Sequence, residues 1–159
     1  MLNVLILCTG NSCRSIIGEA LINHLGHGRL RGFSAGSQPT GQVNPGAIAV
    51  LERHGLGTAE FHSKTWDSFG EQAFDLVITV CDNAAGETCP LYPGRAVKGH
   101  WGIPDPAHVN GSEAEITAAF ATTFEQLTAR IECLLALPIE TFNDADLRAA
   151  LNEIGATTP

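Results

Sequence analysis

Long apolar runs are absent from this sequence. No segment approaches the ~20 consecutive apolar residues that a membrane-spanning helix needs. The first residues, Met1-Leu2-Asn3-Val4, also lack the basic start, apolar stretch and small-residue cleavage site of a secretory signal. We therefore expect a cytoplasmic protein that does not bind a membrane.

Basic residues are scarce as well. The chain has 9 Lys and Arg against 17 Asp and Glu, which gives a formal net charge of −8. This balance argues against binding nucleic acid through a broad basic surface. It leaves room for a small anion, because a local cradle of backbone N–H groups can bind an anion within an acidic protein.

Metal-ligand spacings are also missing. The six histidines show no ligand pattern, and we expect no metal site. Five cysteines in a reducing compartment are not expected to form a framework of structural disulfides. They are instead candidates for core residues, metal ligands or redox-active thiols.

The order of the expected elements indicates an α/β fold. The 159 residues contain no repeat, low-complexity segment or linker, and strands alternate with helices. This order predicts a parallel sheet covered on both faces. The expected strands are 3–7, 31–35, 74–80 and 96–101. The expected helices are 15–25, 45 to a stop at Gly55, 112–137 and 143–154, with a short helix from Trp66.

The stretch from Val4 to Ser15 combines an apolar strand that ends at Cys8, a tight loop and a helix start. Backbone N–H groups in such a loop point inward, and they favour a thiolate at its mouth. Cys8 is the candidate nucleophile, and Arg14 is the candidate ligand for two oxygens of a tetrahedral oxyanion. The alternative is a buried structural cysteine at a strand end. The expected cradle consists of Thr9, Gly10, Asn11, Ser12, Cys13, Arg14 and Ser15.

Individual loop residues have more specific expected roles. Gly10 permits the positive φ that such loops need, and Asn11 is a plausible brace. Ser15 either donates a hydrogen bond to the Cys8 sulfur or caps the helix. We expect Cys13 to be a structural filler rather than a reactant.

Asp105 lies between two prolines, which restrict the local backbone. A carboxylic acid held there could protonate a leaving oxygen, although an aspartate in an ordinary turn is the alternative. Cys8, Cys81 and Asp105 each follow an expected strand. We therefore expect them at the same edge of the sheet.

Cys81 and Cys89 share one Gly- and Pro-containing loop. Two thiols in a flexible loop can form a disulfide and open it again. The alternatives are a zinc site, for which the usual close pairs are missing, or two unrelated core cysteines. Cys133 falls in the long expected helix and is expected in the core.

Taken together, Cys8 to Ser15, Asp105-Pro106-Ala107 and Cys81…Cys89-Pro90 resemble the arsenate reductases that share the low-molecular-weight tyrosine phosphatase fold. The resemblance covers about residues 2–135. It implies a four-stranded parallel sheet flanked by helices on both faces. It also divides the chain into a reductase domain, 1–137, and a C-terminal extension with a short helix, 138–159, to which no function is assigned.

The resemblance further implies a mechanism. Cys8 attacks arsenate, Asp105 protonates the departing oxygen, and Cys81 attacks the Cys8 sulfur as arsenite leaves. Cys89 then takes over the disulfide, which thioredoxin, or glutathione with glutaredoxin, would reduce. No bound cofactor is needed. The loop from Cys81 to Cys89 is one residue longer than in thioredoxin-linked members, so the electron donor stays open.

Some members of that family hold potassium near positions matching Asn11 and Glu19. In this chain the matching segment carries Lys64 and no aspartate, so we expect no obligatory potassium site. Two alternative functions remain. A tyrosine phosphatase would use Cys8, Arg14 and Asp105 without the second cysteine pair, and a non-catalytic module would bind oxyanions or sense redox state.

Overall fold

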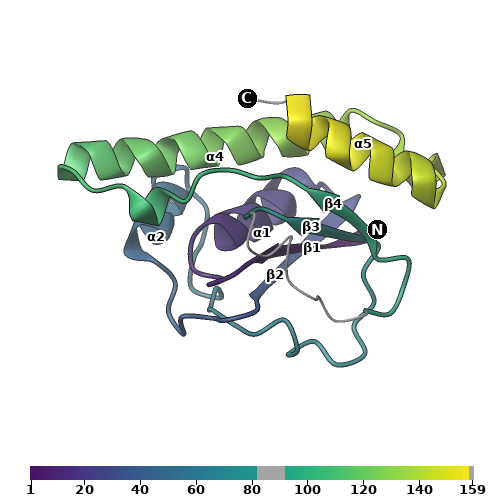
Figure 1. Ribbon diagram of the computed structural model, residues 1–159, viewed down its shortest axis with the longest axis horizontal. Coiled ribbons are helices and arrows are strands. Elements are labelled where there is room, and N and C mark those ends of the chain that lie inside the picture. Colours follow the sequence, from purple (N-terminus) through teal and green to yellow (C-terminus); the bar gives the residue numbers. More distant parts are fainter. Residues whose placement is uncertain (82–91, 158–159) are drawn as a thin grey trace.

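The computed structural model describes residues 1–81 and 92–157 (Figure 1). The first half contains β1 (Leu2–Cys8), α1 (Arg14–Leu25), β2 (Leu30–Gly36), α2 (Pro45–Arg53) and β3 (Leu76–Thr79). The second half contains β4 (Val97–His100), η1 (Pro106–His108), α4 (Glu113–Leu135), η2 (Ile139–Thr141) and α5 (Asp144–Thr157). No helix within these described ranges is long and apolar enough to cross a bilayer.

The four strands form one parallel sheet in the order β2-β1-β3-β4. This confirms the predicted four-stranded parallel sheet. β1 is central, and its run from Val4 to Cys8 is buried on both faces, which explains its continuous apolar sequence. The register pairs Leu7 with Thr79 and Thr79 with His100. The loops after β1, β3 and β4 therefore meet at one edge, as expected.

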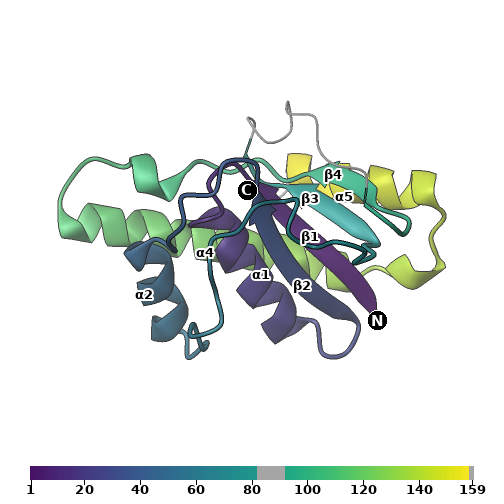
Figure 2. The ribbon, with the colours of Figure 1, turned by 90° about the horizontal axis from the view of Figure 1, so that it is seen from below.

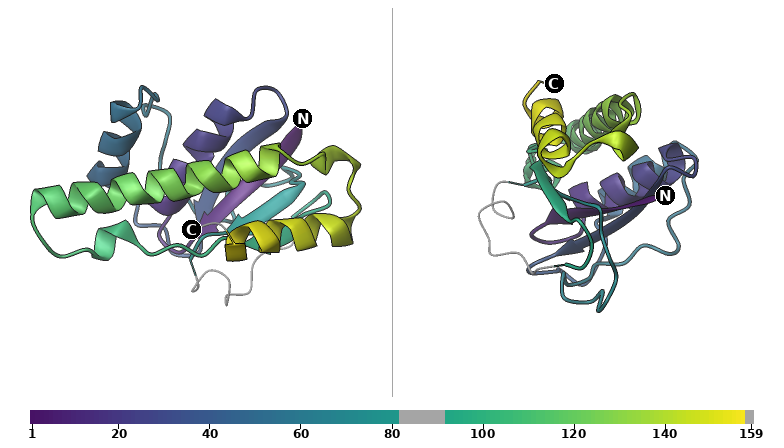
Figure 3. Two further views of the ribbon diagram at one scale, coloured as in Figure 1. Left: turned by 90° about the horizontal axis from the view of Figure 1, so that it is seen from above. Right: turned by 90° about the vertical axis from the view of Figure 1, so that its right-hand side faces the viewer.

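The helices α1, α2, α4 and α5 pack against one another and against one face of the sheet (Figures 1 and 3). They enclose the main core together with Val4 and Ile6 of β1. α4 begins with a capping box in which Ser112 and Glu115 bond reciprocally. Its buried positions include Leu127, Ile131 and Leu134. Cys133 lies off this stripe and is exposed, so its expected place in the core is wrong.

The second face of the sheet, which is turned toward the viewer in Figure 2, carries a smaller apolar cluster. Its members are Leu5, Leu7, Phe33, Ala35, Trp66, Phe69, Phe74, Val77, Tyr92 and Ala96. In the described part of the chain, turns and loops pack against this face, and residues 66–71 form turns, so the short helix expected from Trp66 is wrong. Large aromatic rings in edge-to-face contact can bury this face without a helix.

The C-terminal residues pack onto the same core. Leu147, Leu151 and Ile154 of α5 are buried in it. Two ion pairs at the surface also connect residues 140–144 to the rest of the chain. Arg29 Nε donates to Glu140 Oε2 at 2.7 Å, and Arg95 Nε donates to Asp144 Oδ1 at 2.7 Å.

Candidate active site

The loop between β1 and α1 surrounds a small cavity of about 40 Å³. Its lining residues are Cys8, Gly10, Ser12, Cys13, Arg14 and Asp105. The structure thus brings the expected nucleophile, the expected oxyanion ligand and the expected acid to one place. A cavity this small suits a single tetrahedral ion.

The backbone of the loop is oriented with its carbonyl groups away from the cavity. The carbonyl oxygens of Thr9, Gly10 and Ser12 accept hydrogen bonds at 2.9–3.0 Å from backbone N–H groups within 38–44. The N–H groups of 10–13 have no backbone acceptor in the described ranges. They remain available to an anion, with the N-terminus of α1 adding partial positive charge.

A chain of hydrogen bonds ends on the Cys8 sulfur. The backbone N–H of Lys64 donates to Asn11 Oδ1 at 2.9 Å, which places the other end of the amide, Nδ2, against Ser15 Oγ at 2.8 Å. Because Ser15 Oγ accepts this bond, its own proton is free to point at Cys8 Sγ, 3.1 Å away. Ser15 lies inside α1 and does not cap it. Its position fits the first of its two expected roles, support of the thiolate.

The strained position of the loop is Asn11 rather than Gly10. Asn11 is fully buried with φ of 46°, whereas Gly10 has no positive φ. Asn tolerates this conformation, and its side chain is bonded at both ends. The expected bracing role of Asn11 fits this geometry, while the positive φ expected at Gly10 is wrong. Gly36 matters instead: a side chain there would collide with the carbonyl oxygen of Thr9.

Arg14 and Asp105 lie against each other at the cavity. Arg14 Nη2 is 3.4 Å from Asp105 Oδ2, and Arg14 Nη1 donates to the Ile103 carbonyl at 3.0 Å. The other carboxylate oxygen of Asp105 accepts from the Ala107 N–H at 2.9 Å, which starts η1. His108 Nε2 lies 3.4 Å from Oδ2 on the solvent side. Asp105 is therefore positioned by local turn geometry and by Arg14.

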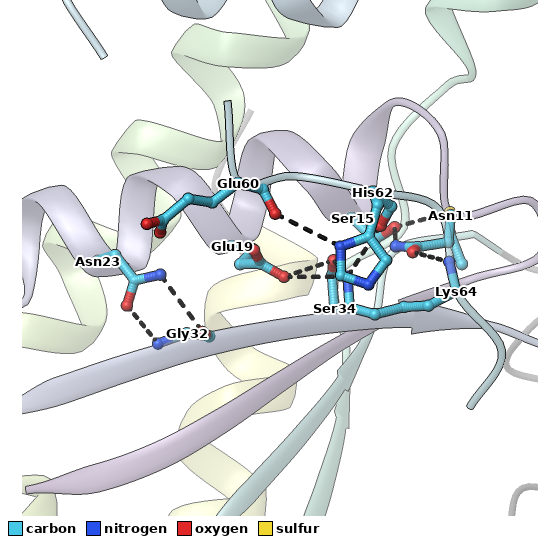
Figure 4. Close-up of polar contacts among 10 residues, drawn as sticks. Asn11, Ser15, Glu19, Asn23, Gly32, Ser34, Glu60, His62 and Lys64 are labelled. Atoms are coloured by element: carbon cyan, nitrogen blue, oxygen red, sulfur yellow. Dashed lines mark hydrogen bonds and ion pairs between the residues drawn. The ribbon is translucent and has the colours of Figure 1, made fainter. Parts of the chain in front are cut away.

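A second polar cluster lies beneath the loop (Figure 4). Lys64 Nζ is 3.5 Å from Glu19 Oε1 and 3.4 Å from Ser34 Oγ, and it donates to the His62 carbonyl at 3.0 Å. Ser34 also donates to Glu19 at 2.7 Å. The Lys64 and Glu19 side chains are only 15% and 13% exposed. The ammonium group thus occupies the space between α1 and β2 while the Lys64 backbone braces Asn11.

Cys13 is unsuited to nucleophilic attack. Burial raises the pKa of its thiol to about 11, and contact with the Ser12 hydroxyl only partly opposes this rise. A thiol with this pKa stays protonated at neutral pH. The expectation that Cys13 fills space rather than reacts agrees with this environment.

Cys81 lies beside the loop, two residues after the end of β3. It is 5% exposed, and its sulfur is 3.5 Å from the hydroxyl of Thr9, the neighbour of Cys8. The expected partner Cys89 lies outside the described residues. Among those described, no group of three or more His, Cys, Asp or Glu could hold a metal ion.

Several supporting groups could not be identified from the sequence. The sequence shows that Lys64 and Glu19 are charged, but it does not show where they lie relative to the loop. The Ile103 carbonyl could not be identified either, because every residue has a backbone carbonyl group. The close approach of the Thr9 carbonyl to Gly36 occurs at the last residue of β2, and no sequence pattern marks it.

The sequence profile described as "Low molecular weight phosphotyrosine protein phosphatase" matches residues 3–146. An arsenate reductase of Bacillus licheniformis is 38% identical over 127 residues, covering 79% of this chain and 89% of the relative. One from Halalkalibacterium halodurans is 36% identical over 126 residues, with the same coverage of both chains. A solved arsenate reductase in the phosphate-binding state is 29% identical, with a TM-score of 0.67, covering 86% of this chain and 98% of that one.

Proposed function

The chain belongs to the low molecular weight phosphotyrosine protein phosphatase family, and we propose that it works within this family as an arsenate reductase. The observation that carries this proposal is the place of Cys81. A phosphatase needs one thiol at the oxyanion cavity, whereas here a second thiol touches the loop through Thr9, 3.5 Å from its hydroxyl. A second thiol so placed can attack the sulfur of Cys8, so that the two thiols become a disulfide and together give two electrons to the bound ion.

In the first step the cavity binds arsenate, with the inward N–H groups of the loop and Arg14 on its oxygens. The Cys8 thiolate attacks the arsenic, while Asp105 as the carboxylic acid gives its proton to a departing hydroxyl group. That group leaves as water, and a Cys8–arsenic(V) bond forms. The phosphate-binding relative supports the choice of a tetrahedral oxyanion.

In the second step the Cys81 thiolate attacks the Cys8 sulfur. A Cys8–Cys81 disulfide forms, and the electron pair of the sulfur–arsenic bond stays on arsenic, which leaves as arsenite. Cys89 then attacks Cys81, which frees Cys8 and moves the disulfide to Cys81–Cys89. No bound cofactor is required, because the two thiols supply both electrons.

An external thiol completes the cycle by reducing the last disulfide. Thioredoxin, or glutathione with glutaredoxin, is the proposed donor, and a reducing cytoplasm is the proposed location. The test is arsenite formation with each donor in turn. Cys81→Ser and Cys89→Ser should each abolish turnover with thioredoxin, while the matched control Cys133→Ser keeps it. Arsenite formation by Cys81→Ser with thioredoxin as sole donor would disprove the relay, and no arsenite from the wild type with either donor would disprove the function.

A phosphatase is the second candidate, because Cys8, Arg14 and Asp105 surround a cavity that suits phosphate equally well. It predicts cleavage of an aryl phosphate that is insensitive to Cys81→Ser. A wild type that hydrolyses aryl phosphates and yields no arsenite would favour this alternative.

A further inference from the structure

The helix α5 lies mostly beyond the part of the chain that its relatives share. The family profile ends at residue 146, whereas α5 continues to Thr157. It packs beside α4 along β4, the edge strand of the sheet (Figures 1 and 3). A helix in this place covers the unpaired side of an edge strand, which is otherwise open to other chains.

The contacts of α5 are concentrated at the end of β4. The backbone N–H of His100 donates to Asn152 Oδ1 at 3.1 Å, and the indole Nε1 of Trp101 donates to the Leu151 carbonyl at 2.9 Å. Trp101 is fully buried. The helix thus holds both the backbone and the largest side chain of this segment.

Two glycines allow α5 to approach this closely. A side chain at Gly99 would meet Leu151 Cβ at 2.6 Å, and one at Gly155 would collide with the carbonyl oxygen of His100. Because α5 and residues 99–101 are in such close contact, a displacement of α5 must displace these residues as well. The position of α5 is therefore coupled to the position of residues 99–101.

The same segment leads into the candidate active site within a few residues. The Ile103 N–H donates to the Val80 carbonyl at 3.1 Å, and the Ile103 carbonyl accepts from Arg14 at 3.0 Å. Asp105 follows two residues later and lies 3.4 Å from Arg14. Only three residues separate Trp101 from Asp105, so we expect a displacement at Trp101 to reach Asp105.

We propose that α5 is a positioning element for Arg14 and Asp105. By docking on His100 and Trp101, it fixes the Ile103 carbonyl and the Asp105 carboxyl at the cavity. The inference rests on the proposed function in one respect, that Asp105 delivers the proton during arsenate reduction. Its effect on Arg14 does not depend on that function.

The test is Gly155→Ala in the full chain, which forces the last turns of α5 away from His100. We expect kcat for arsenite formation to fall about tenfold or more, since small displacements of a proton donor are costly. Alkylation of Cys8 by iodoacetamide should stay within about twofold, because its partner Ser15 lies outside this segment. The phosphate concentration that half-protects Cys8 should rise about threefold or more as Arg14 loses its fixed position.

Ala149→Gly is the matched control, because it weakens the same helix at an exposed position without touching the strand. It should leave kcat and phosphate protection unchanged. Asn152→Ala is the milder second variant, should Gly155→Ala fail to fold. We expect it to lower kcat about two- to fivefold through loss of one hydrogen bond.

A double-mutant cycle separates positioning from general destabilisation. In an Asp105→Asn background and at saturating arsenate, Gly155→Ala should lower kcat by less than about twofold further, because Asp105 has lost its proton and the effect through Arg14 then appears in KM. A tenfold loss in both backgrounds, or wild-type kcat and phosphate protection in Gly155→Ala, would overturn the inference. If the wild type forms no arsenite, the proposed function fails, and phosphate protection still decides whether α5 positions Arg14.

Discussion

The hydrogen bond from Ser15 to Cys8 can be removed by deleting a single atom, the Ser15 Oγ. Ser15→Ala deletes the hydroxyl that lies 3.1 Å from the Cys8 sulfur and 2.8 Å from Asn11 Nδ2. The backbone at this position is helical, which alanine favours, so the helix itself should persist. The change therefore tests the hydrogen-bond chain and little else.

Two magnitudes follow from the geometry. A hydrogen bond to a charged group contributes about 1.5–3 kcal/mol, so its loss should slow the alkylation of Cys8 about 10- to 100-fold. The fully buried Asn11 amide also loses its acceptor, which should lower the free energy of unfolding by about 1–3 kcal/mol.

The assay is the rate of Cys8 alkylation by iodoacetamide at constant pH, followed by mass spectrometry of the peptide that carries it. Urea unfolding measures the stability change in parallel. Ser37→Ala is the matched control, since the Ser37 hydroxyl is buried without a hydrogen-bond partner in the described part of the chain. It should change neither quantity appreciably.

An alkylation rate within about twofold of wild type, with the protein folded, would refute the reasoning, since even the weakest charge-assisted bond predicts a larger change. The thiolate would then depend on the loop N–H groups and the helix N-terminus alone. A loss of stability without a loss of reactivity would show that Ser15 serves only to satisfy Asn11.

Three further predictions test other parts of the structure. Because the pKa of Cys13 is raised to about 11, its alkylation should stay slow at pH 8 and accelerate only as the pH approaches about 11, whereas exposed Cys133 should react readily at pH 8. Hydrogen bonds from Arg29 lower the pKa of Glu140 from 4.5 to about 2. The pair therefore stabilises the fold above about pH 4.5, and Glu140→Gln should lower Tm at pH 7 by an amount that shrinks as the pH falls towards about 2; a difference independent of pH would contradict this. Lys64→Met leaves the poorly exposed Glu19 carboxylate without its cation and should lower the rate of arsenite formation. Potassium chloride should restore part of this rate in the variant and leave the wild-type rate unchanged. A wild-type rate that rises with potassium would contradict the prediction.

Much of the fold could be predicted from local patterns. The four strands and the long helix agree with the expected ranges to within a few residues, because continuous apolar runs and helical spacing reflect burial directly. The covering of the second sheet face could not be predicted. Aromatic side chains from separate turns bury it, and their meeting depends on contacts across the chain.

The choice between Gly10 and Asn11 shows a different limit. Both residues accept a positive φ, so local preference cannot decide between them. The positive φ occurs at Asn11, whose side chain accepts a hydrogen bond from the backbone N–H of Lys64, 53 residues away in the sequence. Only a long-range contact made the distinction.

The sequence by itself determined the attacking part of the site. Cys8, the loop and Arg14 are close in the chain, and a strand followed by a tight loop and a helix leaves them few arrangements. The tertiary structure decided what supports them: the donor role of Ser15, the place of Lys64 and the contact of Cys81 with Thr9. These depend on segments far apart in the chain, and their closeness results from burying the whole core at once.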